Sequence, residues 1–213
     1  MTDEASSAAV LVEGRPGAMI VIISGPSGVG KDTILRSLKS ISAQPERHFV
    51  VTYKTRAPRD SEVDGVDYQF VSNAEFERLM RAGRLLESAE VHGYWSGTPR
   101  DQVEQALAAG RDAILKIDVQ GADMVKRMVP AALRIFVAPP SAEDLTARLT
   151  GRGTETPADL ARRRSDADGE MQRRSEYDYV VVNETDQAEQ TALEIDGIIR
   201  HEHALYPERR IEL

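Results

Sequence analysis

The sequence predicts an α/β fold in which a parallel sheet is flanked by helices. Short apolar segments alternate with segments of helical periodicity along the 213 residues, and strands that alternate with helices favour a parallel sheet covered on both faces. In addition, the glycine-rich stretch GPSGVGKDT at 25–33 joins the first apolar segment to the first helical one. This order of strand, loop and helix is the context in which a phosphate-binding loop occurs.

The individual elements follow from local patterns. Apolar runs bounded by glycine or polar residues predict strands at 19–24, 48–55, 85–93, 112–119, 132–138 and 177–183. Helical spacing and capping residues predict helices after Lys31, over 72–83 and 98–110, near 121–128, from Ser141 to Gly151, from Thr156 onward and near 186–204. Ser72 and Glu75 form a capping-box pair, and Thr98 is the expected cap of the helix that starts at Pro99.

The composition limits the possible function classes. The chain length suits one domain, with room for a small inserted subdomain. A formal net charge of −8 argues against a general nucleic-acid-binding protein, which normally carries a basic face. The chain has no cysteine, which excludes disulfides and thiolate metal sites and suits a cytoplasmic protein. No apolar run is long enough to span a membrane, and residues 1–18 are expected to form a flexible tail rather than a signal peptide.

The stretch at 25–33 is interpreted as a modified phosphate-binding loop. Its glycines allow a tight turn that points backbone N–H groups at an anion, and the next helix adds its positive N-terminal end. Lys31 can bridge the terminal phosphates of a nucleotide, but the next position holds Asp32 instead of serine or threonine. The alternative is a glycine-rich turn that binds nothing, which the flanking strand and helix disfavour.

A second phosphate contact is indicated by the stretch TYKTRAPR at 52–59. Arg56 and Arg59 are separated by a proline-stiffened spacer, and two arginines presented in this way can clamp a phosphate through charge-assisted bonds. In isolation this signal is weak, because most exposed arginine pairs are simply solvated.

Further segments follow the loop in a specific order. They are EVDGVDYQF at 62–70, LLESAEVHGYWSGTPR at 85–100, LKIDVQG at 115–121, APPSAEDLTARLTGRGTET at 138–156 and YDYVVVNE at 177–184. Together with the loop and the arginine pair, they resemble the guanylate kinase family from about Met19 to about Arg200. Each segment alone is modest evidence, but their common order at compatible spacings is highly specific. The resemblance implies phosphoryl transfer from ATP, carried with Mg²⁺, to GMP.

The resemblance also implies a division of the chain into parts. Residues 19–204 would form the kinase domain, and 205–213 a C-terminal tail. Within that domain the core would comprise 19–51, 99–150 and 171–204, the GMP-binding insert 52–98 and the helical lid 151–170. The expected partners are ATP and GMP, with no nucleic acid and no membrane, and the oligomeric state stays open.

The resemblance assigns the GMP-binding residues one by one. Arg56 and Arg59 match the arginines that hold the GMP phosphate, with help from Tyr68. Glu87 matches the carboxylate that accepts from the ring N–H and the amino group of guanine, a donor pair that adenine lacks. The remaining matched positions near the base or the metal are Thr52, Thr98 and Asp118.

The resemblance also assigns ATP binding to the loop and to a few residues beyond it, and it assigns the catalytic residues. The ATP-binding residues are Gly25, Pro26, Ser27, Gly28, Val29, Gly30, Lys31, Asp32, Thr33, Arg152 and Asn183. Phosphoryl transfer depends mainly on positioning and charge neutralisation, and the residues expected to supply these are Lys31, Arg56, Arg148 and Arg163. Thr33 and Asp118 are the expected protein contacts of Mg²⁺. The evidence for Arg148, Arg152 and Arg163 is weaker than that for the loop, because these arginines lie among acidic residues as on a solvated helix.

Three positions depart from the family pattern. Asp32 replaces the loop hydroxyl, Lys116 stands where the family has aspartate, and Ser96 stands where it has a tyrosine that bonds the GMP phosphate. Because the first two changes exchange charge at neighbouring positions, we expect Asp32 and Lys116 to form an ion pair that preserves the local charge. The loss of a phosphate contact at Ser96 is expected to raise the Michaelis constant for GMP.

Two other interpretations stay open at this stage. One is a kinase on the same scaffold with another phosphate acceptor, such as ribose 1,5-bisphosphate. The other is a non-catalytic guanylate-kinase-like interaction module, which typically loses loop or lid residues. Glu87 and the segment EVDGVDY favour a guanine acceptor, and the retained Lys31 and arginines favour catalysis.

Overall fold

The computed structural model describes residues 14–15, 17–41, 46–60, 62–91, 93–150 and 157–213. It confirms the predicted α/β class. The core sheet has five strands in the order β2-β7-β1-β8-β9, and every neighbouring pair is parallel. In sheet order the strands are Arg47–Phe49, Asp112–Lys116, Ile20–Ser24, Leu133–Ala138 and Tyr179–Val182.

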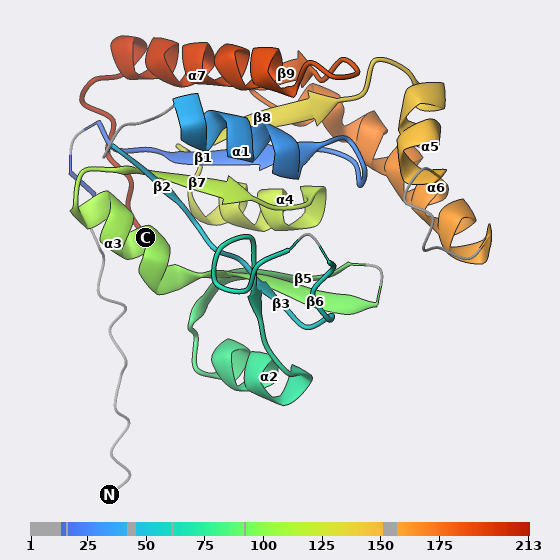
Figure 1. Ribbon diagram of the computed structural model, residues 1–213. Coiled ribbons are helices and arrows are strands. Elements are labelled where there is room, and N and C mark those ends of the chain that lie inside the picture. The colour runs from blue at the N-terminus through green and yellow to red at the C-terminus, as the bar shows by residue number, and fades with distance from the viewer. Residues whose placement is uncertain (1–13, 16, 42–45, 61, 92, 151–156) are drawn as a thin grey trace, which may run out of the picture.

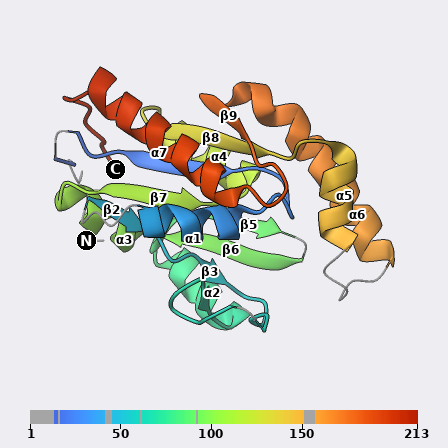
Figure 2. The ribbon, with the colours of Figure 1, turned by 45° about the horizontal axis from the view of Figure 1, so that its top comes forward.

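The core sheet is covered on both faces because its central strand is apolar on both sides. Ile20 and Ile22 of β1 pack into one hydrophobic cluster, whereas Val21 and Ile23 pack into the other. Helices α1 (Lys31–Ile41) and α7 (Ala188–Leu205) cover the second face and lie side by side (Figures 1 and 2). Helices α3 (Arg100–Ala108) and α4 (Val119–Met128) cover the first face.

A second, smaller sheet forms the insert. Its order is β4-β3-β6-β5, in which β6 is antiparallel to both of its neighbours and β3 is parallel to β4. In sheet order the strands are Gln69–Phe70, Tyr53–Lys54, Tyr94–Pro99 and Leu85–Val91. Helix α2 (Asn73–Arg81) covers the face that points away from the core, at the bottom of Figure 1. Its fully buried Phe76 stacks on Trp95, with ring centroids 5.8 Å apart.

Two further helices lie beside the carboxyl ends of the core strands. Helix α5 spans Ala142–Thr150 and helix α6 spans Pro157–Gln172, and a short 3₁₀ helix at Arg173–Glu176 leads into β9. They lie at the right of Figure 1, and α5 packs Leu145 and Leu149 into the same cluster as α1. Among the described residues, no helix is both long and apolar enough to cross a membrane.

Two local predictions in the insert were wrong, and its strands β4 and β6 were not predicted. The segment predicted as one strand at 48–55 forms β2 and β3, which belong to different sheets, so the chain passes from core to insert there. Strand β6 was not predicted, because Gly97 and Pro99 interrupt its apolar pattern. Thr98 does not cap α3, because it lies in β6 and the cap position is Pro99, which has no side-chain bond.

The predicted tails are shorter than expected where the structure describes them. Gly14 N–H donates to the Ile211 carbonyl at 3.0 Å, and Gly17 N–H donates to the Arg209 carbonyl at 2.9 Å. Ile211 is 1% exposed and belongs to the hydrophobic cluster on the α3 and α4 face. The described residues between 14 and 18 therefore pack with the C-terminal segment instead of forming a loose tail.

Candidate active site

The glycines of the phosphate-binding loop are required by close neighbours. Gly25 has φ 139°, and a Cβ there would lie 2.2 Å from the Val137 carbonyl oxygen. Gly30 has φ 103°, and a Cβ there would lie 2.5 Å from the Asn183 side-chain nitrogen. Because side chains rarely adopt such φ values, glycine is the only residue that fits without strain. The loop therefore has a fixed shape, held between β1, β8 and the end of β9.

Lys31 lies folded over this loop. Its ammonium donates to the carbonyl oxygens of Gly25 and Pro26, at 3.0 Å for the second. Burial lowers the pKa of Lys31, against the opposing effect of Glu170 on α6. The Glu170 carboxylate also accepts from the Ser27 backbone N–H at 3.3 Å. Sequence reasoning did not single out Glu170, because it is one of several acids on a helix that looks solvated.

Arg148 and Asn183 brace the loop from behind. The Arg148 guanidinium donates to the Val29 carbonyl at 3.2 Å and to the Asn183 carbonyl at 2.9 Å. The buried Asn183 amide donates to the same Val29 carbonyl at 2.7 Å. Both side chains therefore brace the loop through the Val29 carbonyl. Arg163 lies half-buried on α6, and Arg152 lies outside the described residues.

The predicted ion pair between Asp32 and Lys116 is present. The Lys116 ammonium contacts the Asp32 carboxylate, and the Tyr68 hydroxyl donates to the same carboxylate at 3.1 Å. Burial would raise the pKa of Asp32, but Lys116, Lys31 and the Tyr68 hydroxyl together outweigh it and lower this pKa to about 2. Burial would likewise lower the pKa of Lys116, but Tyr68 and Asp32 raise it. The pair therefore stays ionised at neutral pH.

The two arginines predicted to hold a phosphate share one carboxylate. Arg56 makes a bidentate bond to Glu62, with both N···O distances 2.6 Å. The backbone N–H of Arg59 donates to Glu62 at 2.9 Å, and its guanidinium lies 3.7 Å from the same carboxylate. The Arg59 side chain is 45% exposed. In this arrangement Glu62 bonds the same guanidinium groups that an incoming phosphate would bind.

The predicted guanine-reading carboxylate is buried against the core. Glu87 is 5% exposed and accepts from the Thr98 hydroxyl at 2.6 Å. Burial raises the pKa of Glu87 to about 7, since it outweighs the Thr98 bond, and nearby Asp118 raises it further. A Cβ on Gly121 would lie 2.7 Å from the Glu87 carboxylate, so that glycine lets the carboxylate reach the start of α4.

The remaining predicted residues lie around this site with different roles. Asp118 caps α4, because its carboxylate accepts from the backbone N–H groups of Gln120 at 3.2 Å and Gly121 at 3.3 Å. Thr52 is buried just before β3, and Thr33 is exposed in the first turn of α1. The described residues contain no cluster of three histidines or carboxylates for a metal. The oxygen donors of the predicted contacts Thr33 and Asp118 suit Mg²⁺ that is carried mainly by nucleotide phosphates.

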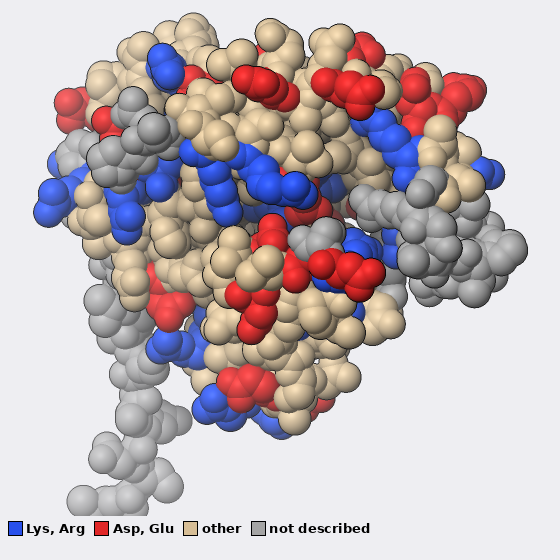
Figure 3. Space-filling view, in the orientation of Figure 1, with Lys and Arg blue, Asp and Glu red and all other residues tan. Residues whose placement is uncertain are grey.

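Basic side chains gather where the core meets the insert. Figure 3 shows Lys and Arg in a band between the upper core and the lower insert, with carboxylates beside them. Lys54 on β3 lies with Arg56 and Lys116 around the ring of Tyr68, and sequence reasoning missed it. Burial outweighs the opposing effect of Asp118 and lowers the pKa of Lys54 to about 8. In the sequence, Lys54 is only a lysine close to Arg56 and Arg59, and such a lysine is easily interpreted as solvated.

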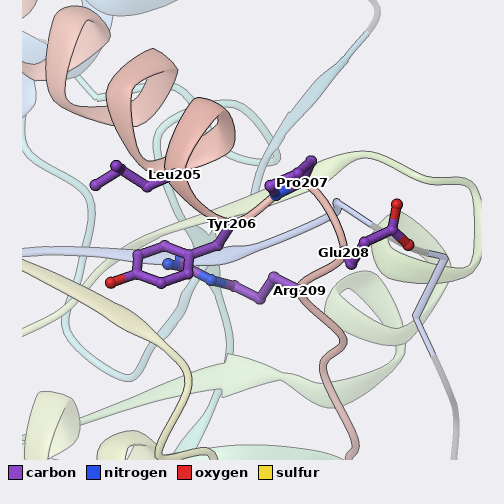
Figure 4. A pocket seen from close by; sticks show the side chains of 5 residues that line it. All are labelled: Leu205, Tyr206, Pro207, Glu208 and Arg209. Carbon is purple, nitrogen blue, oxygen red and sulfur yellow. The ribbon is translucent and has the colours of Figure 1, made fainter.

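Two surface pockets lie away from this site. One, of about 390 Å³, is lined by Leu205, Tyr206, Pro207, Glu208 and Arg209 at the end of α7 (Figure 4). The other, of about 360 Å³, is lined by Arg78, Leu79, Ala82 and Arg84 beside α2. Neither is lined by a predicted site residue. Arg209 is already held by Glu202 and lies over the Tyr206 ring, 4.7 Å from its centroid, so we assign no ligand there.

The fold and the site define a nucleotide kinase with a phosphate-binding loop and an inserted acceptor-binding sheet. The family model for guanylate kinase matches residues 17–202, and the chain belongs to the guanylate kinase family. It is 48% identical over 172 residues to a guanylate kinase of Nocardia farcinica, covering 80% of this chain and 88% of that one. It is 44% identical over 190 residues to one of Symbiobacterium thermophilum, covering 89% and 88%. A crystal structure of guanylate kinase from Anaplasma phagocytophilum superposes with a TM-score of 0.71 at 33% identity, covering 89% and 88%.

Proposed function

We propose that this protein transfers the terminal phosphoryl group of ATP to GMP, giving ADP and GDP. One observation carries the proposal: the Tyr68 hydroxyl of the insert bonds Asp32 in the first turn of the loop helix at 3.1 Å. The predicted acceptor-phosphate site and the predicted ATP-phosphate site therefore meet at one point. Such proximity is what a direct transfer between two bound nucleotides requires.

One group of residues would bind ATP and a second group would bind GMP. On the ATP side, the loop amides and Lys31 would bind the phosphates, while Arg148 and Asn183 hold the loop in shape. On the GMP side, Arg56, Arg59 and Tyr68 would bind the phosphate, and Glu87 would accept from the guanine edge. Mg²⁺ bound with ATP supplies further neutralisation of phosphate charge. Thr33 and Asp118 are the proposed protein contacts nearest to it.

Binding of GMP requires exchanges of partner. Arg56 and Arg59 have to leave Glu62 in part, and the Glu87 carboxylate has to lose a proton so that it accepts two hydrogen bonds. On the ATP side, Lys31 has to leave the loop carbonyls. Helices α5 and α6 carry Arg148 and Arg163 and would exclude water when the site closes, which favours transfer to GMP over hydrolysis. We propose that the reaction is cytoplasmic, which the cysteine-free composition favours.

The test is a coupled assay of ADP release with MgATP and one acceptor at a time: GMP, AMP, UMP or CMP. Turnover with GMP alone supports the proposal. ATP binding without turnover of any of these acceptors would contradict it and direct attention to ribose 1,5-bisphosphate as acceptor. Absence of ATP binding would contradict catalysis altogether and favour an interaction module.

A further inference from the structure

Lys54 is a buried lysine of the site that lies over the ring of Tyr68. Among the described residues, its ammonium makes no hydrogen bond or ion pair, although burial lowers the pKa of the side chain to about 8. Other buried cations of the site are paired: Arg56 with Glu62 and Lys116 with Asp32. A buried ammonium without a hydrogen-bond partner is costly unless a ligand supplies one. Lys54 is therefore a buried cation of the insert that a bound anion would satisfy.

The strand register shows where Lys54 points. It lies directly opposite Ser96 in the antiparallel pair of β3 and β6, so both side chains lie on the same face of the sheet. Along β6, Ser96 shares that face with Thr98, which bonds Glu87. The other face carries Trp95 and Gly97, which pack against Phe76 of α2. The Lys54 side chain is thus on the face of the guanine-reading carboxylate.

Three cations surround the ring of Tyr68. The Lys116 ammonium lies 3.9 Å from its centroid, the Lys54 ammonium 5.3 Å and the Arg56 guanidinium 5.5 Å. The carboxylates of Asp32 and Glu62 balance two of these charges. The third charge, on Lys54, lies 5.3 Å from the ring centroid of Tyr68, the residue that is expected to bond the acceptor phosphate. A dianionic phosphate placed there would satisfy both Lys54 and Tyr68.

We propose that Lys54 binds the phosphate of GMP and replaces the contact that Ser96 is too short to make. This inference rests on the proposed function. The hydroxyl of Ser96 is buried in β6 close to its own backbone, whereas the four-carbon stem of a lysine extends several ångströms further from the same pair of strands. Ser96, which departs from the family pattern, therefore has the longer and charged Lys54 directly opposite it on the neighbouring strand.

The test compares GMP with guanosine, which lacks the phosphate. Binding is followed by the fluorescence of Trp95, the single tryptophan of the chain, next to Ser96 in β6. Lys54→Met should weaken GMP binding about tenfold to a hundredfold, as expected for a lost bond to a charged group, and should leave guanosine binding within about twofold. Lys54→Arg should retain most of the GMP affinity. Lys39→Met, which removes another partly buried lysine over the Phe49 ring, is the matched control and should change neither.

A second variant makes the replacement itself testable. Ser96→Tyr should recover GMP affinity in the Lys54→Met background and improve it much less in the wild type, because the tyrosine and the lysine would supply the same contact. Unchanged GMP affinity in Lys54→Met, or an equal loss for guanosine, would overturn the proposal. If Lys54→Met does not fold, Lys54→Gln is measured against the same two ligands. Failure of the wild-type protein to bind or phosphorylate GMP would instead refute the proposed function.

Discussion

The phosphate-binding loop and the insert hold their charged groups in different ways. The loop is fixed mainly by backbone: its glycines fit against Val137 and Asn183, and the Val29 carbonyl receives bonds from Arg148 and Asn183. The insert is fixed by pairs of charged side chains, such as Arg56 with Glu62. The loop backbone keeps its shape when a ligand arrives, although Lys31 has to leave two loop carbonyls, whereas in the insert the binding arginines themselves have to exchange partners. The acceptor side is therefore where pH and substitutions are expected to change affinity most readily.

The two regions meet at the ion pair of Asp32 and Lys116. Lys116 ends β7 of the core, Asp32 lies in the first turn of α1, and both contact Tyr68 of the insert. The exchange of charge at these two positions raises their summed charge from −1 to 0 relative to a hydroxyl and an aspartate, so the ion pair is formed as predicted but the local charge is not preserved. It also gives α1 a carboxylate that accepts a hydrogen bond from Tyr68 of the insert, so a substitution in one region is expected to alter the contacts of the other.

The largest expected effect tests the loop side. Lys31→Met should lower kcat by about 10²–10³-fold, because a preorganised charge that neutralises the transferring phosphoryl group is lost. It should change GMP affinity little, since Lys31 bonds only loop carbonyls in the ligand-free protein. Steady-state kinetics with MgATP and GMP measures both quantities. Lys39→Met at the other end of α1 is the control, and activity within threefold of wild type in Lys31→Met would refute this role.

The next effect tests the insert through pH. Because Glu87 has a pKa of about 7 in the ligand-free protein, guanosine affinity should fall about tenfold for each pH unit below that value. Guanosine is used because a phosphate itself titrates near pH 6. Calorimetric titration from pH 5.5 to 8 measures the slope, and ATP binding should not share it. Glu87→Gln should bind guanosine weakly at every pH, so a retained slope in that variant would assign the titration elsewhere.

The raised pKa of Glu87 also makes the stability of the folded protein depend on pH. A carboxyl pKa raised above its ordinary value of 4.5 stabilises the folded protein at low pH, and this contribution is lost as pH rises through about 7. Glu87→Gln should therefore flatten the dependence of unfolding free energy on pH between about 4.5 and 7. Urea unfolding at several pH values measures this, and an unchanged slope would contradict the assignment.

The connection between the regions is tested by a double-mutant cycle. Lys116→Asp alone places two carboxylates side by side, and Asp32→Ser alone leaves a buried ammonium unpaired, so each should reduce kcat/KM for GMP. The double variant should recover activity, with a coupling of about 1–3 kcal/mol. Arg84 and Asp101 form an exposed pair at 2.9 Å and serve as the control, in which losses should be small and additive. Strictly additive losses for Asp32 and Lys116 would show that the pair is not coupled in function.

The smallest effect compares two helix caps. Ser72 caps α2 of the insert by accepting from the Glu75 N–H at 3.2 Å, and Ser141 accepts from the Asp144 N–H at 3.0 Å at the start of α5. Each serine-to-alanine variant should lose about 1 kcal/mol of stability. Ser72→Ala should raise the KM for GMP slightly through the insert and leave the KM for ATP unchanged, whereas Ser141→Ala should act on ATP. Thermal unfolding and kinetics distinguish the two, and equal effects on both substrates would contradict this separation.

The sequence by itself determined much of the core. Alternating apolar and amphipathic segments predicted every strand of the parallel sheet in its place, although β2 had to be separated from β3. The loop between β1 and α1 was predicted because its glycines and Lys31 form a local pattern. Even the ion pair of Asp32 and Lys116 was expected, since the change of charge at each position is visible in the chain.

Only the tertiary structure decided which groups share partners. Glu62 between two arginines, Glu170 at the Ser27 N–H and Lys54 opposite Ser96 all depend on side chains brought together from separate segments or strands. The role of Thr98 also changed, because pairing with β5 placed it on Glu87 instead of at a helix start. Local patterns record backbone preference and burial, but hydrogen bonds between distant side chains arise only when the chain is folded.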